Sequence, residues 1–202
     1  LAAYLGSSMF YRDALNGLYG FGGIYAIGVL EWSIVQIGVF GVVGAMAAAI
    51  FSWLGGLADR RYGPKPVIVF CCLVLIVVCT IVVGMSRHSF FGIALAPGSA
   101  LPDVVFYICG GLIGGAGGAL QSASRTMMVR HTDPARPTEA FGLYALSGKA
   151  TAFLAPALIG AVTYATGSQQ WGISPLIGLF IIGIVLLGWV KPGGEQGKWA
   201  SS

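Results

Sequence analysis

The stretch that decides the fold is residues 54–65, LGGLADRRYGPK, a charged and glycine-rich segment between two long apolar runs. On its amino side residues 35–51 are almost wholly apolar, and on its carboxyl side residues 67–83 are apolar again. A helix needs about 20 mainly apolar residues to cross the hydrocarbon core of a bilayer. The stretch therefore predicts a tight polar turn at a membrane surface, between two spanning helices.

The composition of the whole chain is that of an integral membrane protein. Of its 202 residues 56% are hydrophobic and only 9% are charged, whereas soluble domains have about 45–50% apolar and about 25% charged residues. The 32 glycines fit helical spans, because small residues let helix backbones approach closely in a membrane. We therefore expect an all-α protein whose first partner is the lipid bilayer.

Six windows are long and apolar enough to span, and they must be helical because lipid cannot satisfy backbone polar groups. They are residues 2–26, 33–58, 67–86, 103–128, 140–166 and 174–190. Counted over alternate connections, seven basic residues fall on one side and Arg87 alone on the other; the seven are Arg60, Arg61, Lys65, Arg130, Arg136, Lys191 and Lys198. The positive-inside rule then places both chain ends in the cytoplasm.

Several function classes have no support in the sequence. The net charge of +4 is spread without a basic block, so we expect no nucleic-acid partner. The four cysteines all fall in apolar runs, where they are expected to be packing residues rather than metal ligands. No HExxH, GxSxG or P-loop motif occurs, and His88 and His131 are expected to be isolated in loops. We expect no enzyme, no cofactor and no metal site.

Polar residues inside three spans carry the functional prediction. The first span contains Arg12, Asp13 and Asn16, the fourth contains Gln121 and Arg125, and the fifth contains Lys149. A charge near mid-membrane costs about 2.5–3.5 kcal/mol on insertion scales, so such side chains rarely face lipid. A central polar cavity between helices would collect them, as in secondary transporters.

These polar residues also have structural interpretations. An ion pair between Asp13 and Lys149 would neutralise both charges and merely hold two helices together. Arg125 lies close enough to the end of its span to extend to the membrane surface. The glycines at 110, 114 and 118 form a small-residue face expected to pack against another helix. Pro156 predicts a kink in the fifth span, either a static bend or a flexing point.

Residues 54–65 resemble the cytoplasmic signature loop of the major facilitator superfamily. One residue is added between the aspartate and the second glycine, Arg60 or Arg61, and Pro64 stands where a basic residue is common. The matching and flanking positions, which we expect to act in gating, are Gly55, Asp59, Arg60, Arg61, Gly63 and Lys65.

Three further stretches resemble the vacuole effluxer or UMF group of that superfamily: YRDALNG at 11–17, QSASR at 121–125 and EAFGLYALSGKAT at 139–151. The resemblance implies the carboxyl-terminal six-helix half of a twelve-helix transporter, with an amino-terminal half missing. It also implies movement of a small solute by alternating access, with amino-acid export in fungal members. We further expect a bacterial inner membrane.

The expected substrate or ion pathway consists of Arg12, Asp13, Asn16, Gln121, Arg125, Tyr144 and Lys149. In this interpretation Asp13 binds a coupling proton or cation, Arg12 or Lys149 meets an anionic group of the solute, and the glycine-rich fourth helix moves. The alternative is a non-transporting structural or partner-binding membrane subunit, in which the same residues only hold helices together.

Overall fold

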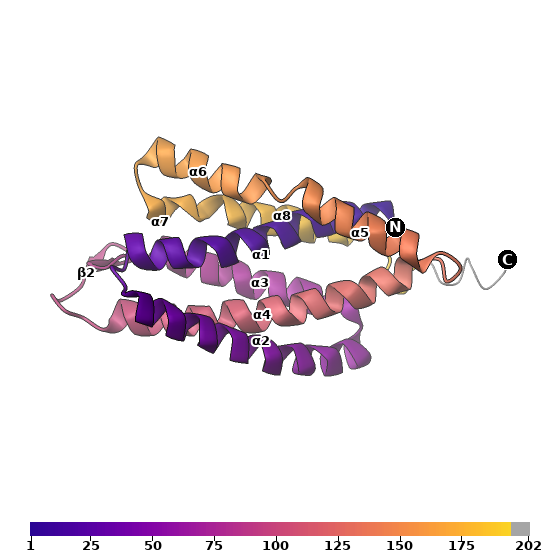
Figure 1. The fold of residues 1–202 in the computed structure, drawn as a ribbon, viewed down its shortest axis with the longest axis horizontal. Coiled ribbons are helices and arrows are strands. Elements are labelled where there is room, and N and C mark those ends of the chain that lie inside the picture. Colours follow the sequence, from indigo (N-terminus) through magenta and orange to yellow (C-terminus); the bar gives the residue numbers. More distant parts are fainter. Residues whose placement is uncertain (195–202) are drawn as a thin grey trace.

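The computed structural model describes residues 1–194 as a bundle of long helices that run side by side (Figure 1). The N-terminus and the end of the described chain lie at one end of the bundle. A short hairpin, in which β1 (Ser89–Phe90) pairs with β2 (Ile93–Ala94), lies at the other. The helices are α1 (Ala2–Gly28), α2 (Ile34–Tyr62), α3 (Pro64–Val83), α4 (Leu101–His131), α5 (Pro137–Ala150), α6 (Leu154–Thr166), α7 (Gln169–Gly172) and α8 (Ser174–Gly188).

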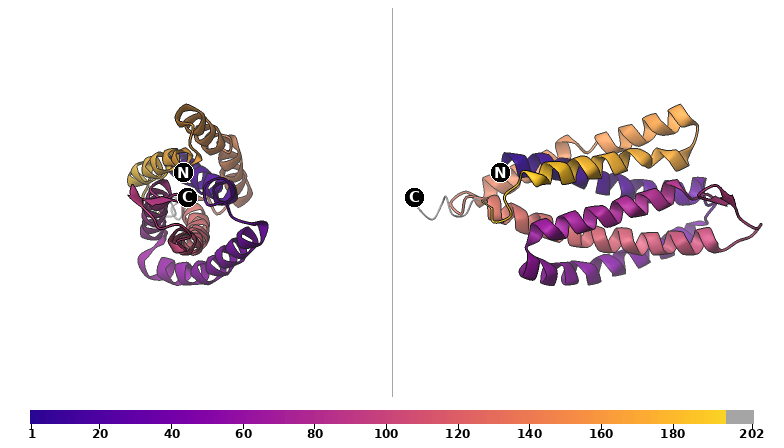
Figure 2. Two further views of the ribbon diagram at one scale, coloured as in Figure 1. Left: turned by 90° about the vertical axis from the view of Figure 1, so that its left-hand side faces the viewer. Right: turned by 180° about the vertical axis from the view of Figure 1, so that it is seen from behind.

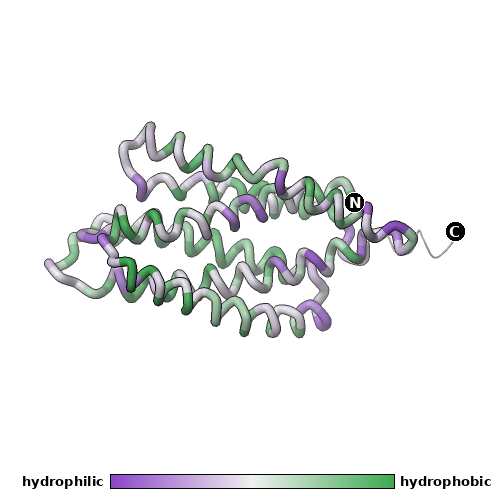
Figure 3. The backbone as a smooth tube through the Cα atoms, viewed as in Figure 1, coloured by the Kyte–Doolittle hydropathy of each residue, from purple (hydrophilic) through white to green (hydrophobic). Residues whose placement is uncertain are grey.

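Within residues 1–194, five helical stretches are long and apolar enough to cross a membrane. They are α2, α3, α4, the α5–α6 segment Pro137–Thr166 and the α7–α8 segment Gln169–Gly188. Helix α1 is 27 residues long but is not among them; Arg12, Asp13 and Asn16 are among the polar residues that lower its hydropathy. Hydrophilic segments lie at the two ends of the bundle and also at a few places along its length (Figure 3). The fold is that of a helical multi-pass membrane protein with five clear spans, and the expected count of six is not confirmed.

The helix ends differ from the predicted spans by a few residues, and local capping explains most of the difference. Helix α2 begins after Ser33, whose side chain and that of Gln36 form a reciprocal capping box. Helices α3 and α4 begin with Pro64 and Pro102 in their first turns, where a missing N–H costs nothing. The last predicted span, 174–190, is preceded by the single turn α7 and ends at Gly188.

Residues 54–65 form much less of a loop than predicted. Helix α2 continues to Tyr62 and α3 begins at Pro64, so Gly63 is the only residue between them, with a φ of 86° that favours glycine. The last turn of α2 carries Arg60 and Arg61, whose positive charges suit the negative end of the helix dipole. The charged cluster is therefore helical, and the turn itself is one residue long.

The glycines of α4 pack against α2, as the small-residue pattern predicts. A Cβ on Gly114 would overlap the backbone of Gly44, and a Cβ on Gly118 would lie 2.7 Å from the carbonyl oxygen of Ala48. These two backbones approach so closely that only glycine fits at either position of α4. The contact fixes α2 along the length of α4.

The fifth predicted span, 140–166, is broken instead of merely kinked. Helix α5 ends at Ala150 and α6 begins at Leu154, with a turn at residues 151–153. Pro156 lies in the first turn of α6, where its ring would clash with the carbonyl of Ala152 if the helix were continuous. The interruption therefore lies one turn before the proline and leaves the N-terminus of α6 inside the bundle.

The hairpin end of the bundle is held by one carboxylate. Asp103, in the first turn of α4, accepts hydrogen bonds from Trp32 Nε1 at 2.6 Å and from Arg87 Nη1 at 2.7 Å. The hydrogen bond to Asp103 raises the pKa of Arg87 above its ordinary value. Trp32 follows α1 and Arg87 precedes the hairpin, so Asp103 joins three segments at this end.

Two helical segments present most of their surface outward. In α2 only Gly55 and Asp59 are buried, and α5 and α6 bury two residues each. The end-on view shows α2 and the α5–α6 segment at opposite edges of the bundle (Figure 2). The core lies mainly between α1, α3, α4 and α8.

Candidate functional site

Asp13 lies near the middle of α1 and caps the interrupted helix α6. Its side chain is almost completely buried, with the residue 1% exposed, and its Oδ2 accepts the backbone N–H of Ala155 at 2.8 Å. Ala155 is the second residue of α6, where backbone N–H groups have no partner within the helix. The partial positive charge of a helix N-terminus also favours a carboxylate. The second oxygen, Oδ1, is buried and has no hydrogen-bond partner within residues 1–194.

Arg12 and Tyr144, predicted as separate pathway residues, are in direct contact. Arg12 Nη1 donates to the carbonyl oxygen of Tyr144 at 2.9 Å, and the guanidinium carbon lies 3.8 Å from the centre of the Tyr144 ring. This arrangement combines a hydrogen bond with a cation–π contact. A Cβ on Gly148 would lie 2.8 Å from Arg12 Nη2, so glycine leaves room for the guanidinium. Arg12 therefore joins the middle of α1 to α5.

A cavity of about 680 Å³ lies between α1 and the α6–α7 segment. Asn16 contributes to its wall from α1, and Pro156 contributes from the first turn of α6. Thr163 and Gln169 also line it, and the Thr163 hydroxyl and Gln169 Oε1 are buried without hydrogen-bond partners in the described structure. Both oxygens lie behind the surface of the cavity, Thr163 Oγ1 against Gly172 and Gln169 Oε1 against Gly28. The cavity is beside α1 and α6, the two helices that Asp13 joins.

The other three predicted pathway residues are not brought to Asp13. Gln121 and Arg125 on α4 and Lys149 in the last turn of α5 are exposed. The suggested ion pair between Asp13 and Lys149 is absent from the described residues, because the carboxylate is bound to the Ala155 amide instead. The predicted pathway set therefore divides into a joined group on α1, α5 and α6 and a separate exposed group.

A buried tyrosine network joins α1 to α4, and the sequence interpretation missed it. Tyr4, Tyr11 and Ser124 are all 0% exposed. The Tyr11 hydroxyl lies 2.9 Å from Ser124 Oγ and donates to the Tyr4 hydroxyl at 3.2 Å, while Tyr4 donates to the Ser124 carbonyl at 2.5 Å. Tyr4 and Tyr11 are seven residues apart and share a helix face, which is the sequence signal for such a network.

His131 was predicted to be isolated in a loop, and this prediction is wrong. It is the last residue of α4, it is 3% exposed, and its Nδ1 lies 3.0 Å from the carbonyl oxygen of Met127. Its ring stacks on Tyr4 at a centroid distance of 5.5 Å, and Tyr4 stacks on Tyr144 at 6.3 Å. Together with Arg12 over Tyr144, the rings form a column from the end of α4 to the middle of α1.

The predicted gating residues lie at the end of the bundle that carries the N-terminus. Asp59 is 6% exposed, and its Oδ1 lies 4.0 Å from Arg130 Nη2 of α4. Lys65 Nζ donates to the carbonyl oxygens of Gly188, the last residue of α8, at 3.1 Å and of Val190, just beyond it, at 2.7 Å. The α2–α3 junction is thereby tied to both α4 and α8.

The remaining gating residues have simpler environments. Gly55 packs on α4, where an added Cβ would lie 2.8 Å from Ala119 Cβ, and Arg60 and Arg61 are exposed. Across the described part of the chain, no three His, Cys, Asp or Glu side chains gather closely enough to hold a metal ion.

The family model described as "Vacuole effluxer Atg22 like" matches residues 1–197, nearly the whole chain. The chain belongs to this effluxer family. Similar proteins include Autophagy-related protein 22 of Cryptococcus neoformans, 26% identical over 178 residues, which are 87% of this chain and 30% of the relative. Another is the uncharacterized MFS-type transporter YxiO of Bacillus subtilis, 26% identical over 145 residues, which are 72% of this chain and 30% of the relative.

The alignment to Autophagy-related protein 22-2 of Emericella nidulans covers 98% of this effluxer-family chain at 24% identity, and 33% of the relative. The chain therefore spans about a third of the length of the curated relatives it matches. No solved structure gives a significant match. Family membership establishes a multi-pass membrane protein of a transporter family.

Proposed function

We propose that this chain forms the helical half of a secondary active transporter that moves a small solute by alternating access. The observation that carries the proposal is Asp13, a buried carboxylate that caps a helix interrupted inside the bundle, near a cavity lined in part by the polar residues Asn16 and Gln169. Interrupted helices whose termini point at binding sites are a recurring device of secondary transporters.

In this proposal Asp13 is the coupling site for a proton or a cation. The free Oδ1 can accept a proton without breaking the hydrogen bond between Oδ2 and Ala155. Protonation removes the negative charge that favours the N-terminus of α6, a favourable interaction of about 0.3–2 kcal/mol. Helix α6 is then held less firmly against α1 and is free to shift about the turn at 151–153. Proton binding is thereby linked to the shape of the cavity.

The solute class that suits this site is a small zwitterion such as an amino acid. Asp13 can attract an ammonium group, while Arg12 or Lys149 can pair with a carboxylate. Asn16 and Gln169 supply amide groups that donate and accept hydrogen bonds within the cavity. Gln121 and Arg125, exposed on α4, are proposed to line the pathway outside this cavity.

A second set of helices completes the pathway in this proposal, giving a twelve-helix transporter of which the chain is the carboxyl-terminal half. The exposed surfaces of α2 and of the α5–α6 segment are the faces available to it. In this arrangement α1 also crosses the membrane, which brings the number of spans in this half to six. The end of the bundle that carries the basic residues of the α2–α3 junction faces the cytoplasm. We propose a bacterial inner membrane as its location; the relatives that it resembles come from both fungi and a bacterium.

The α2–α3 junction is proposed to act as a gate and not to touch the solute. Asp59 of α2 lies close to Arg130 of α4, and Lys65 of α3 binds the end of α8. A movement of α2 would therefore disturb α4, and a movement of α3 would disturb α8. The pair between Asp59 and Arg130 is partly buried but long, at 4.0 Å, so we expect it to bias two states without locking one. The variant Asp59→Asn should change the transport rate while leaving the affinity for the solute unchanged; a pure loss of affinity would contradict this role.

The decisive experiment is transport in proteoliposomes that contain the full-length protein, an imposed pH gradient and a panel of radiolabelled amino acids. Asp13→Asn should abolish stimulation by the gradient, and Lys149→Ala should raise the concentration for half-maximal uptake. Glu139→Gln is the matched control, because it also converts a carboxylate to an amide but is exposed at the start of α5. Uptake unchanged in both site variants would overturn the assignment of Asp13 and Lys149. No uptake by the wild-type protein would favour the alternative, a non-transporting membrane subunit.

A further inference from the structure

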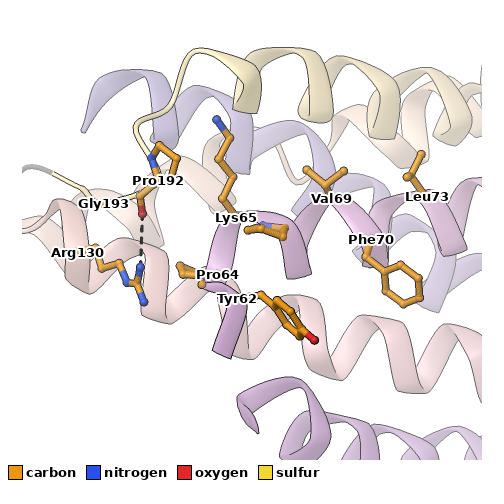
Figure 4. A pocket seen from close by; sticks show the side chains of 11 residues that line it. Tyr62, Pro64, Lys65, Val69, Phe70, Leu73, Arg130, Pro192 and Gly193 are labelled. Carbon is orange, nitrogen blue, oxygen red and sulfur yellow. Dashed lines mark hydrogen bonds between the residues drawn. The ribbon is translucent and has the colours of Figure 1, made fainter. Parts of the chain in front are cut away.

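A hollow of about 540 Å³ opens at the basic end of the bundle, beside the first turns of α3 (Figure 4). Its wall includes Tyr62 from the end of α2, Lys65 and Phe70 from α3, and Arg130 from α4. Arg130 Nη1 lies 3.5 Å from the carbonyl oxygen of Pro192, which closes the opposite side. The hollow therefore has a basic rim and an apolar floor.

A second, apolar groove of about 470 Å³ continues from this hollow between α2, α3 and α4. The two share Tyr62, Pro66 and Phe70, so they form one surface that passes from the end of the bundle toward its middle. The farther wall contains no charged side chain and includes Gly111 and Gly115 of α4. Since α2, α3 and α4 are all long and apolar enough to cross a membrane, the groove lies at hydrocarbon depth.

The rim of the hollow, formed by Lys65 and Arg130, carries a net positive charge and has N–H donors that are not used within the protein. Lys65 uses two of its three N–H donors on carbonyl oxygens, and Arg130 uses one of its five on Pro192. The Arg61 guanidinium lies 5.4 Å from the centre of the Tyr62 ring, which places a third cation beside the shared wall. Among the described residues, Asp59 is the one carboxylate paired with this group, at 4.0 Å from Arg130.

We propose that this surface binds an anionic phospholipid, with the phosphate at Lys65 and Arg130 and one acyl chain in the groove. Phosphate oxygens are the acceptors that arginine and lysine side chains bind best, and basic hollows between spanning helices suit anionic headgroups. A free phosphate would leave the apolar groove unfilled, and a zwitterionic lipid would not match the rim. The surface is remote from the cavity beside Asn16, so the proposal does not rest on transport.

The test is native mass spectrometry of the purified chain, titrated with phosphatidylglycerol or phosphatidylcholine of identical acyl chains. Phosphatidylglycerol should be retained several-fold more tightly. Arg130→Gln should weaken its retention about fivefold, the effect of one basic residue at an anionic surface. Arg136→Gln is the matched control, because it removes a positive charge from the same end of the bundle but outside the hollow. Equal losses in both variants would mean general surface attraction and would overturn the site.

A groove-filling variant tests the acyl chain separately. A Cβ at Gly111 would meet only Val43 at 3.9 Å, so Gly111→Leu can be accommodated and its side chain would occupy the groove. It should lower retention of both lipids, whereas Gly56→Leu, which has open space around its Cβ and lies outside the groove, should not. Retention unchanged in Gly111→Leu would overturn the placement of the acyl chain.

A second measurement keeps the proposal testable if Gly111→Leu does not fold. Phe70 is 67% exposed in the wall that the hollow and the groove share, so Phe70→Trp provides a fluorescent reporter. Its signal is the fluorescence of the variant minus that of the parent chain, which contains other tryptophans. Brominated phosphatidylglycerol in vesicles should quench this signal several-fold more than brominated phosphatidylcholine. Equal quenching by both lipids, or protection of the reporter by association of two copies, would refute the anionic-lipid site.

Discussion

Removing the Asp13 side chain should destabilise α6 more than any other single change in the first helix. In Asp13→Ala the Ala155 N–H loses its acceptor in a buried position, which costs about 1–3 kcal/mol. Loss of the charge at the N-terminus of α6 adds about 0.3–2 kcal/mol. Relief of a buried carboxylate with one partnerless oxygen offsets part of this cost. We expect a net destabilisation of about 2 kcal/mol for Asp13→Ala.

Asp13→Asn separates the hydrogen bond from the charge. The amide oxygen of asparagine can still accept from Ala155, so only the interaction of the charge with the helix terminus is lost. The free energy of unfolding should therefore fall in the order wild type, Asp13→Asn, Asp13→Ala. A charge deletion at exposed Glu139 should change it by less than about 0.5 kcal/mol.

The assay that resolves this order is amide hydrogen exchange in detergent, read on peptides from α6 and from α3. Local opening of α6 should accelerate its exchange about tenfold for each 1.4 kcal/mol, while α3 keeps its protection. Denaturation monitored by the circular dichroism signal of the helices gives the global free energy of unfolding for comparison. If Asp13→Ala leaves the exchange of α6 unchanged, the capping role is refuted; if all helices lose protection equally, Asp13 stabilises the bundle as a whole instead.

Two further changes test other contacts of the bundle. Gly114→Leu should lower the stability by about 1–3 kcal/mol, because its Cβ overlaps the backbone of Gly44, whereas Gly38→Leu, with open space at its Cβ, should be nearly neutral in a thermal melt. Asp103→Asn should weaken the contact with Arg87 and accelerate hydrogen exchange in the β1–β2 hairpin, at a cost of about 1 kcal/mol because the pair is partly exposed; unchanged exchange would argue against its role.

Local rules predicted where one helix gives way to the next and the close helix contact, although the helix ends differ from the predicted spans by a few residues. Pro64 and Gly63 act within one turn of the residues they affect, so a sequence pattern is sufficient to place the α2–α3 junction. The small-residue face at Gly114 likewise indicates a close helix contact, although the partner, α2, comes only from the structure. The same reasoning overestimated the length of the polar loop, because arginines near a helix C-terminus favour continued helix.

The contacts of the candidate site depend on residues far apart in the chain, and local patterns do not contain them. Asp13 and Ala155 are separated by 142 positions, and nothing near Asp13 indicates a capping role. Tyr4 and Tyr11 were counted with the apolar residues, although their hydroxyls bind Ser124 of α4. Pro156 indicated a kink, but its clash falls four residues earlier, and the helix is broken at 151–153 instead.

The buried charge and the interrupted helix explain one another. A helix that begins inside a membrane bundle exposes N–H groups that lipid cannot satisfy, and each would cost several kcal/mol. A carboxylate at the same depth is costly when alone. The contact between Asp13 and Ala155 offsets part of both costs, so neither feature is expected to persist without the other. Under the proposed function, a proton at the free oxygen of the carboxylate would neutralise it, so this contact would link the position of α6 to proton binding in a way that an apolar contact would not.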